Sequence, residues 1–203
     1  MDIKFAEKRG NYFFKNTRNI LQKIKKSDMK KRSMEELNRL DVEAFKKSEK
    51  LPVVVVMDNV RSMNNIGSVF RTCDAFRVER IFLCGITACP PHKDIEKTAL
   101  GATESVDWHY FESTQSAVEK LIADGYNVYA VEQVENSIFL NQFMVEKTEK
   151  IALVFGNEVM GVDQDVINCC CGCIEIPQFG TKHSLNISVS AGIVLWQIAC
   201  LYH

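Results

Sequence analysis

The sequence feature that most constrains the fold is an unbroken apolar run, Val53 to Met57, which directly follows Pro52. Four of its five residues are valine, and β-branched side chains favour strands. A strand with one face in water alternates apolar and polar residues, but this run has no polar position. It therefore predicts a strand buried on both faces, in a parallel sheet that helices cover on both sides.

Further segments with aliphatic and aromatic residues predict strands along the rest of the chain, at 80–84, 106–111, 127–131, 151–155 and 174–176. Helices are predicted between them at 66–76, 92–100, 114–124 and 163–168. Gly125 suits the C′ position after the third, and Asp163 is the candidate cap of the fourth. The final segment alternates like a strand, but its length and Ser184 as a candidate N-cap favour a helix reaching Leu201. Strands that alternate with helices predict an α/β fold with a mainly parallel sheet.

Residues 1–50 differ in composition from the rest of the chain. They hold 15 Lys and Arg against 8 Asp and Glu, a net charge of +7, whereas residues 51–203 have a net charge of −8. Helical spacing predicts helices at 11–26 and 33–47, the second with a capping box of Ser33 and Glu36. A basic arm on an acidic body suits contact with a polyanion such as RNA, and a solvated helical face explains the charge equally well. We therefore predict a basic helical N-terminal extension over 1–50 and one domain over 51–203.

The composition limits the class of protein. No apolar run approaches the roughly 20 residues that span a bilayer, and the first residues lack a secretory signal, so we expect a cytoplasmic protein. Its eight cysteines are poorly spaced for a disulfide framework and are expected to be reduced thiols. Cys170 and Cys173 have C-x-x-C spacing, but no second ligand pair follows, so no metal is expected.

Three polar loops, each after a predicted strand, form the candidate site. The first runs from Asn59 to Ser68 and leads to Arg71, and the second is 156–161, with Glu158 between two glycines. The third is the polar loop 178–183, together with the small and polar residues from Ser184 that follow it. Open α/β sheets bind ligands beyond the carboxyl ends of their strands. The chain has neither G-x-G-x-x-G after a strand nor a P-loop, which argues against a standard dinucleotide or P-loop nucleotide site.

The motifs in these loops resemble those of the SpoU (TrmH-type) RNA 2′-O-ribose methyltransferases of the SPOUT superfamily. They are, in chain order, Asn65-Ile66-Gly67-Ser68-Val69-Phe70-Arg71-Thr72, then Val154-Phe155-Gly156-Asn157-Glu158-Val159-Met160-Gly161, then Ile176-Pro177, Gly180 and Ser184-Leu185-Asn186-Ile187-Ser188-Val189. The resemblance covers about residues 51–201. The chain departs from the common pattern at Arg77, where glycine is frequent, and at Gln178, where methionine is frequent; neither is a catalytic position.

The resemblance implies a fold and a reaction. The C-terminal segment would thread a loop to form a deep trefoil knot, and S-adenosylmethionine would bind between the second and third loops. Gly156, Ile176 and Leu185 would contact this cofactor. The enzyme would methylate a ribose 2′-hydroxyl in tRNA or rRNA, with tRNA slightly favoured. Similar enzymes are homodimers, and the apolar last helix would serve that interface or the core.

The resemblance also implies roles for five residues. Arg71 would be the base, or would instead hold a phosphate and stabilise developing charge, because guanidinium is normally always charged. Asn65 would orient Arg71 or the ribose, and Glu158 would pair with the arginine or hold the geometry of the site. Ser184 and Asn186 would form hydrogen bonds within the site. Without the resemblance, Arg71 is interpreted as part of a surface salt bridge and Ser184 and Asn186 as helix caps.

Two other functions compete with this one. The first is a non-catalytic RNA-binding or ribosome-assembly protein with the same fold, against which the joint presence of the five candidate residues argues. The second is methylation of a base nitrogen, as in other SPOUT members.

Overall fold

The computed structural model describes residues 30–33 and 35–203, so the predicted helix at 11–26 lies outside the described residues. The chain forms two compact units, residues 1–40 and 41–203. In the first, η2 (Glu35–Leu37) is a short 3-10 helix. The expected capping box is present: the Ser33 N–H donates to the Glu36 carboxylate (2.7 Å), and the Glu36 N–H donates to the Ser33 hydroxyl (3.3 Å).

The prediction of one continuous helix over 33–47 is wrong. Asn38 has a φ of 45°, which takes the backbone out of helical geometry, and a second helix, α2 (Val42–Lys47), begins only after Asp41. The Asp41 side chain caps it by accepting from the Ala44 N–H at 2.7 Å. Phe45 of α2 is buried in the core of the larger unit, so that unit begins about ten residues before the expected boundary at 50.

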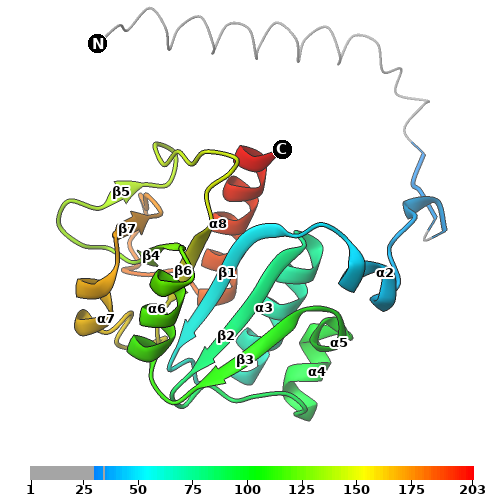
Figure 1. Cartoon of the computed structure of the whole chain (residues 1–203), viewed down its shortest axis with the longest axis horizontal. Helices are drawn as coiled ribbons and strands as arrows, with labels where there is room; N and C mark the ends of the chain where they lie inside the picture. The colour runs from blue at the N-terminus through cyan, green and yellow to red at the C-terminus, as the bar shows by residue number, and fades with distance from the viewer. Residues whose placement is uncertain (1–29, 34) are drawn as a thin grey trace, which may run out of the picture. The chain divides into compact units, whose positions relative to one another are not determined.

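Seven parallel strands form one sheet in the order β3-β2-β1-β6-β4-β7-β5 (Figure 1). The valine run lies in β1, near the middle, and is fully buried as predicted. The two-residue strand β5 was not predicted. The strands are β1 (Leu51–Asp58), β2 (Val78–Cys84), β3 (Asp107–Phe111), β4 (Asn127–Val131), β5 (Ile138–Phe139), β6 (Ile151–Phe155) and β7 (Gly172–Glu175).

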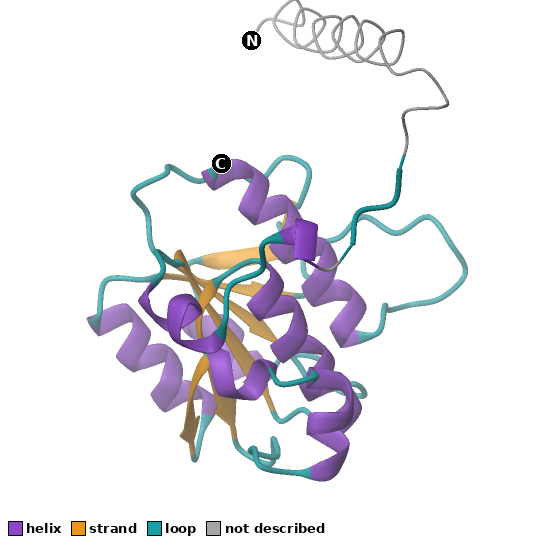
Figure 2. Ribbon diagram, turned by 90° about the vertical axis from the view of Figure 1, so that its right-hand side faces the viewer, coloured by secondary structure: helices purple, strands orange, loops and turns teal. Residues whose placement is uncertain are grey.

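Helices cover both faces of the sheet, as Figures 1 and 2 show. Alternate side chains of β1 enter two separate cores: Val53 and Val55 join one, and Val54 and Val56 join the other. The first core is closed by α3 (Met63–Ala75), α4 (Lys93–Ala99), α5 (Ala102–Ser105) and α8 (Ile187–Tyr202); the second is closed by α6 (Thr114–Ala123) and α7 (Gln164–Cys169). The α/β fold with a parallel sheet is confirmed.

Two helix starts differ from the prediction, and both changes bear on the site. α3 begins three residues earlier than expected, because the Ser62 hydroxyl caps it by accepting from the Asn65 N–H at 3.3 Å. α8 begins after Asn186, whose side chain accepts from the Ser188 N–H at 2.9 Å. Ser184 is therefore not the N-cap and lies in the preceding loop.

The eight cysteines are all unpaired thiols. Across residues 30–33 and 35–203, no three or more His, Cys, Asp or Glu side chains gather where they could hold a metal ion. The same residues include no helix with the length and apolar character needed to cross a membrane.

Candidate active site

Hydrogen bonds join the three predicted loops into one site. The Glu158 carboxylate accepts from the backbone N–H groups of Arg61 and Ser62 and from the Asn65 side-chain amide, each at 3.1 Å. The Asn186 amide in turn donates to the Asn65 carbonyl oxygen at 3.1 Å. Residues from the first, second and third loops are thus connected in a chain, Glu158 to Asn65 to Asn186. The bonds of Asn65 with Glu158 and with Asn186 join residues that are 93 and 121 positions apart in the sequence.

The environment of Glu158 favours the ionised form of its carboxyl group. Partial burial raises the pKa of Glu158, but hydrogen bonds from the backbone of Arg61 and Ser62 and from the Asn65 amide outweigh it, so the pKa lies below its usual value. The carboxylate also lies at the N-terminal end of α3, where the helix dipole favours negative charge. The hydrogen bonds of Glu158 thus connect the second loop to the first loop and to Asn65. Neither ion pair among the described residues includes Glu158 or Arg71.

The lowered pKa of Glu158 predicts a pH-dependent contribution to stability. Because the folded-state pKa is depressed, this contribution is present above the unfolded-state pKa of about 4.3 and is lost as pH falls through the folded value. We expect Glu158→Gln to unfold at lower urea concentration than wild type at pH 7, with the difference shrinking by pH 3. Urea unfolding of both proteins at the two pH values measures this. Glu135→Gln, in an exposed loop, is the control, and an equal difference at both pH values would contradict the account.

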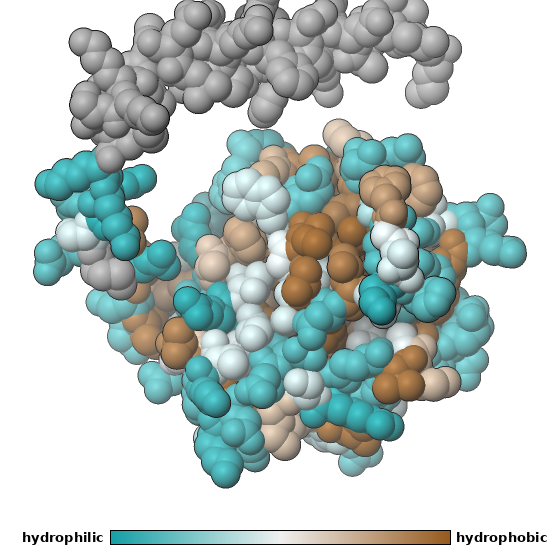
Figure 3. Space-filling model, turned by 180° about the vertical axis from the view of Figure 1, so that it is seen from behind, coloured by the Kyte–Doolittle hydropathy of each residue, from teal (hydrophilic) through white to brown (hydrophobic). Residues whose placement is uncertain are grey.

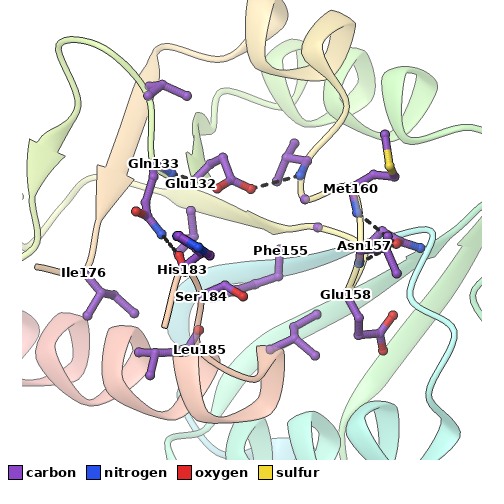
Figure 4. A pocket seen from close by; sticks show the side chains of 18 of the residues that line it. Glu132, Gln133, Phe155, Asn157, Glu158, Met160, Ile176, His183, Ser184 and Leu185 are labelled. Carbon is purple, nitrogen blue, oxygen red and sulfur yellow. Dashed lines mark hydrogen bonds between the residues drawn. The ribbon is translucent and has the colours of Figure 1, made fainter. Parts of the chain in front are cut away.

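A cavity of about 660 Å³ opens beside this network (Figure 4). The second and third loops and the segment after β4 line it. All three predicted cofactor contacts, Gly156, Ile176 and Leu185, are in its wall, together with Glu158, Ser184 and Asn186. Six of the eight predicted site residues therefore surround one cavity.

The two remaining site residues, Asn65 and Arg71, do not line the cavity. Asn65 lies behind Glu158 and Asn186, to which it is hydrogen-bonded. Arg71 is exposed on α3, about 9 Å further along the helix axis. With the described residues its side chain forms no hydrogen bond or ion pair. The structure thus joins Glu158, Asn65 and Asn186 by hydrogen bonds, and Arg71 lies outside this network.

Gly156 is required by the close folding of the second loop. The Asn157 and Gly161 backbones exchange two hydrogen bonds, each of 2.9 Å, which turn the loop back against the end of β6. A Cβ atom on Gly156 would overlap the backbone of Gly161 and Val162. Any side chain at 156 would therefore displace the loop that carries Glu158.

Three further residues fix the loops and were missed by the sequence prediction. The Asn157 amide donates to the Asn59 carbonyl at 2.7 Å, which ties the second loop to the first. After β4, the Glu132 carboxylate accepts from the Val162 N–H at 3.2 Å, and the Gln133 amide donates to the His183 carbonyl at 2.6 Å (Figure 4). Asn157 could have been identified because it lies within the second motif. Glu132 and Gln133 could have been identified because they directly follow a predicted strand, where ligand sites form.

Known proteins are similar to this chain in sequence. The tRNA (guanosine(18)-2'-O)-methyltransferase of Aquifex aeolicus (strain VF5) is 30% identical over 161 residues, which cover 76% of this chain and 72% of the relative. The enzyme of the same name from Thermus thermophilus is 28% identical over 166 residues, which cover 82% of this chain and 84% of the relative.

Solved structures agree with these relatives. The crystal structure of the A. aeolicus TrmH/SpoU tRNA modifying enzyme superposes with a TM-score of 0.68 at 26% identity and covers 79% of each chain. An AdoMet-bound rRNA methyltransferase from Sinorhizobium meliloti has the same fold, with a TM-score of 0.66 at 24% identity over 75% of this chain and 60% of that one. Residues 52–196 match the SpoU rRNA Methylase family. By this match and by its fold, the chain belongs to the SpoU rRNA Methylase family.

Proposed function

We propose that the protein transfers the methyl group of S-adenosylmethionine to the 2′-hydroxyl of a ribose in RNA. The observation that carries the proposal is the hydrogen-bonded chain of Glu158, Asn65 and Asn186, of which Glu158 and Asn186 line the cavity. The relatives from A. aeolicus and T. thermophilus are named as tRNA (guanosine(18)-2'-O)-methyltransferases. Their names favour tRNA over rRNA as the substrate.

The cavity fits the proposed cofactor. Its volume of about 660 Å³ lies within the range of roughly 300–1,000 Å³ found for small-molecule sites. Gly156 would let the cofactor approach the backbone, and Ile176 and Leu185 would supply apolar walls around it. When bound, S-adenosylmethionine supplies an electrophilic methyl group on a sulfonium.

The protein's own residues would prepare the RNA for attack. A ribose hydroxyl is a poor nucleophile until its proton is removed or its developing charge is stabilised. Arg71 is exposed and would hold a substrate phosphate bidentately while it stabilises negative charge on the 2′-oxygen. We favour this role over that of a base, because guanidinium holds its proton at all ordinary pH values.

The hydrogen bonds of Asn65 suit it to orient the ribose. Its amide nitrogen donates to Glu158 and its carbonyl oxygen accepts from Asn186, so both ends of the side chain are held. A side-chain amide has two N–H donors, and the second would bind the substrate. Ser184 is exposed at the cavity wall and would place its hydroxyl beside the cofactor or the ribose.

Exposed apolar side chains beside the cavity suit an RNA substrate. Val159 and Met160 line the cavity, and their side chains are 75% and 83% exposed. Phe179, in the third loop, is 97% exposed. Aromatic and apolar side chains in water offer stacking surfaces for unpaired bases. We propose that these residues contact bases next to the methylated ribose.

We also propose that the C-terminal segment forms the trefoil knot expected from the resemblance. The bond from the Gln133 amide to the His183 carbonyl supports this, because it brings the third loop against the segment that follows β4.

The outer face of α8 supports the proposal of a homodimer. Val189, Ile193 and Trp196 follow one another at helical spacing, and their side chains are 49%, 39% and 60% exposed. The opposite face of α8 lies in the core. Figure 3 shows hydrophobic residues gathered on this side of the molecule. An exposed apolar stripe of this kind favours an interface with another chain.

The dimer proposal predicts a change of mass. We expect Ile193→Glu to convert dimers to monomers, because each dimer would bury two new carboxylates without partners. Light scattering at working concentration measures this, with Ile122→Glu on the exposed face of α6 as the control. Wild-type protein that is already monomeric would contradict the proposal.

The basic extension is proposed to bind RNA outside the site. Residues 1–40 hold 12 Lys and Arg against 5 Asp and Glu, a net charge of +7. Deleting them leaves the compact unit that begins at Asp41. We expect RNA affinity to fall by about tenfold or more in low salt, because phosphate contacts are lost, and the affinity for S-adenosylmethionine to stay within twofold. Unchanged RNA affinity after the deletion would show that the extension has another role.

The proposed function is tested by methyl transfer from labelled S-adenosylmethionine to bulk tRNA and, separately, to rRNA, with digestion to nucleosides. A 2′-O-methylated nucleoside from either pool is the expected result and names the substrate class. A base-methylated nucleoside would instead support the alternative reaction. If the protein neither transfers methyl groups nor binds the cofactor but still binds RNA, the non-catalytic alternative is correct.

A further inference from the structure

We propose that Glu132 makes the cavity select the positively charged cofactor over its neutral product, S-adenosylhomocysteine. This inference rests on the proposed function, because it concerns the ligand of the same cavity. It assigns a specificity role to a residue outside the three motifs.

The charges around the cavity are of one sign. Among the described residues that line it, the only charged side chains are the carboxylates of Glu132 and Glu158, and neither lysine nor arginine is present. Of these described lining residues, His183 is the only other one with an ionisable side chain. A cavity with two carboxylates and no fixed cation has a negative potential, which attracts a cationic ligand.

Glu132 is the better placed of the two carboxylates to act on a ligand. Glu158 lies at the N-terminus of α3 and receives three hydrogen bonds from the first loop, so the helix dipole offsets part of its charge. Glu132 accepts from the Val162 N–H at 3.2 Å and from the Gln133 N–H at 2.8 Å, which fix its position. It is half-buried, and charges that are partly buried are screened less than exposed ones.

The proposed reaction removes one positive charge from the ligand. The bond from the methyl carbon to sulfur breaks as the bond to the 2′-oxygen forms, the electron pair stays on sulfur, and the hydroxyl proton leaves to solvent. The sulfonium thereby becomes a neutral thioether. In the negative cavity the cofactor gains an attraction that the product lacks, so product release is favoured over cofactor release.

The decisive variant is Glu132→Gln, which removes the charge and keeps the size of the side chain. It also keeps one oxygen that can accept from the Val162 N–H, while the bond from the Gln133 N–H is lost. Glu135→Gln is the matched control, because it removes one charge three residues along in the same segment, outside the cavity wall. Calorimetry on the full chain gives the dissociation constants of S-adenosylmethionine, S-adenosylhomocysteine and sinefungin. Sinefungin has an amine in place of the sulfonium and is also cationic, so it separates the effect of charge from that of the methyl group.

We expect Glu132→Gln to weaken binding of S-adenosylmethionine and sinefungin by about tenfold while S-adenosylhomocysteine stays within twofold. The Glu135→Gln protein should bind all three ligands as wild type does. An equal loss for all three ligands in Glu132→Gln would overturn the inference and leave Glu132 with only a structural role. If wild type binds none of the three, the proposed function itself fails, which is a separate outcome.

Discussion

Replacing Arg71 with alanine is expected to lower methyl transfer by about 100- to 1,000-fold, with the dissociation constant of S-adenosylmethionine within twofold of wild type. The reason is the position of Arg71, which is exposed on α3 and outside the cavity wall. Its loss would remove charge stabilisation at the 2′-oxygen without touching the cofactor. Single-turnover transfer rates and calorimetry measure the two effects separately.

A second variant shows what Arg71 contributes. Arg71→Lys keeps one positive charge but loses the planar pair of donors that binds phosphate bidentately. If Arg71 binds a phosphate and stabilises charge, Arg71→Lys is expected to be more active than Arg71→Ala and less active than wild type. A fully active Arg71→Ala protein would contradict the assignment of the site.

Replacing Gly156 with alanine is expected to weaken cofactor binding by about 10- to 100-fold and to lower the melting temperature. The new Cβ atom would overlap the backbone of Gly161 and Val162, so the second loop has to move. That movement would shift Glu158 and open the bonds to Arg61 and Ser62.

A matched control for this variant is Gly172→Ala. The position is in β7, and a Cβ atom there meets only the Tyr129 ring, at an ordinary contact distance of 3.8 Å. This protein should bind the cofactor as wild type does. If Gly156→Ala also binds normally, the second loop is not the wall of the cofactor site.

The sheet could be predicted because its central strand is buried on both faces. Strict burial leaves no polar position in Val53 to Met57, and a short, β-branched run of this kind is typical of a central parallel strand. The break in the helix at Asn38 could not be predicted, because a residue other than glycine in the left-handed conformation leaves only a weak signal in the sequence. β5 is only two residues long and is defined by its pairing with β7.

The network could be predicted in part. The motifs identified Asn65, Glu158 and Asn186, but their bonds depend on strands brought together by the fold. Sequence reasoning allowed an ion pair of Glu158 with Arg71, whereas backbone N–H groups at the start of α3 bind the carboxylate instead. Such a contact follows from where the helix begins, which a pattern places only to within a few residues.

The most direct test of the account uses RNA in which the methylated nucleotide, once located by nucleoside analysis and sequencing of the product, is replaced by its 2′-deoxy form. Initial rates of methyl transfer are measured on this RNA and on the unmodified RNA, with binding of both measured in parallel. The account predicts similar binding of the two RNAs and no transfer to the deoxy form, because the 2′-oxygen is the acceptor. Transfer at the same rate to both RNAs would contradict it and identify the base as the acceptor.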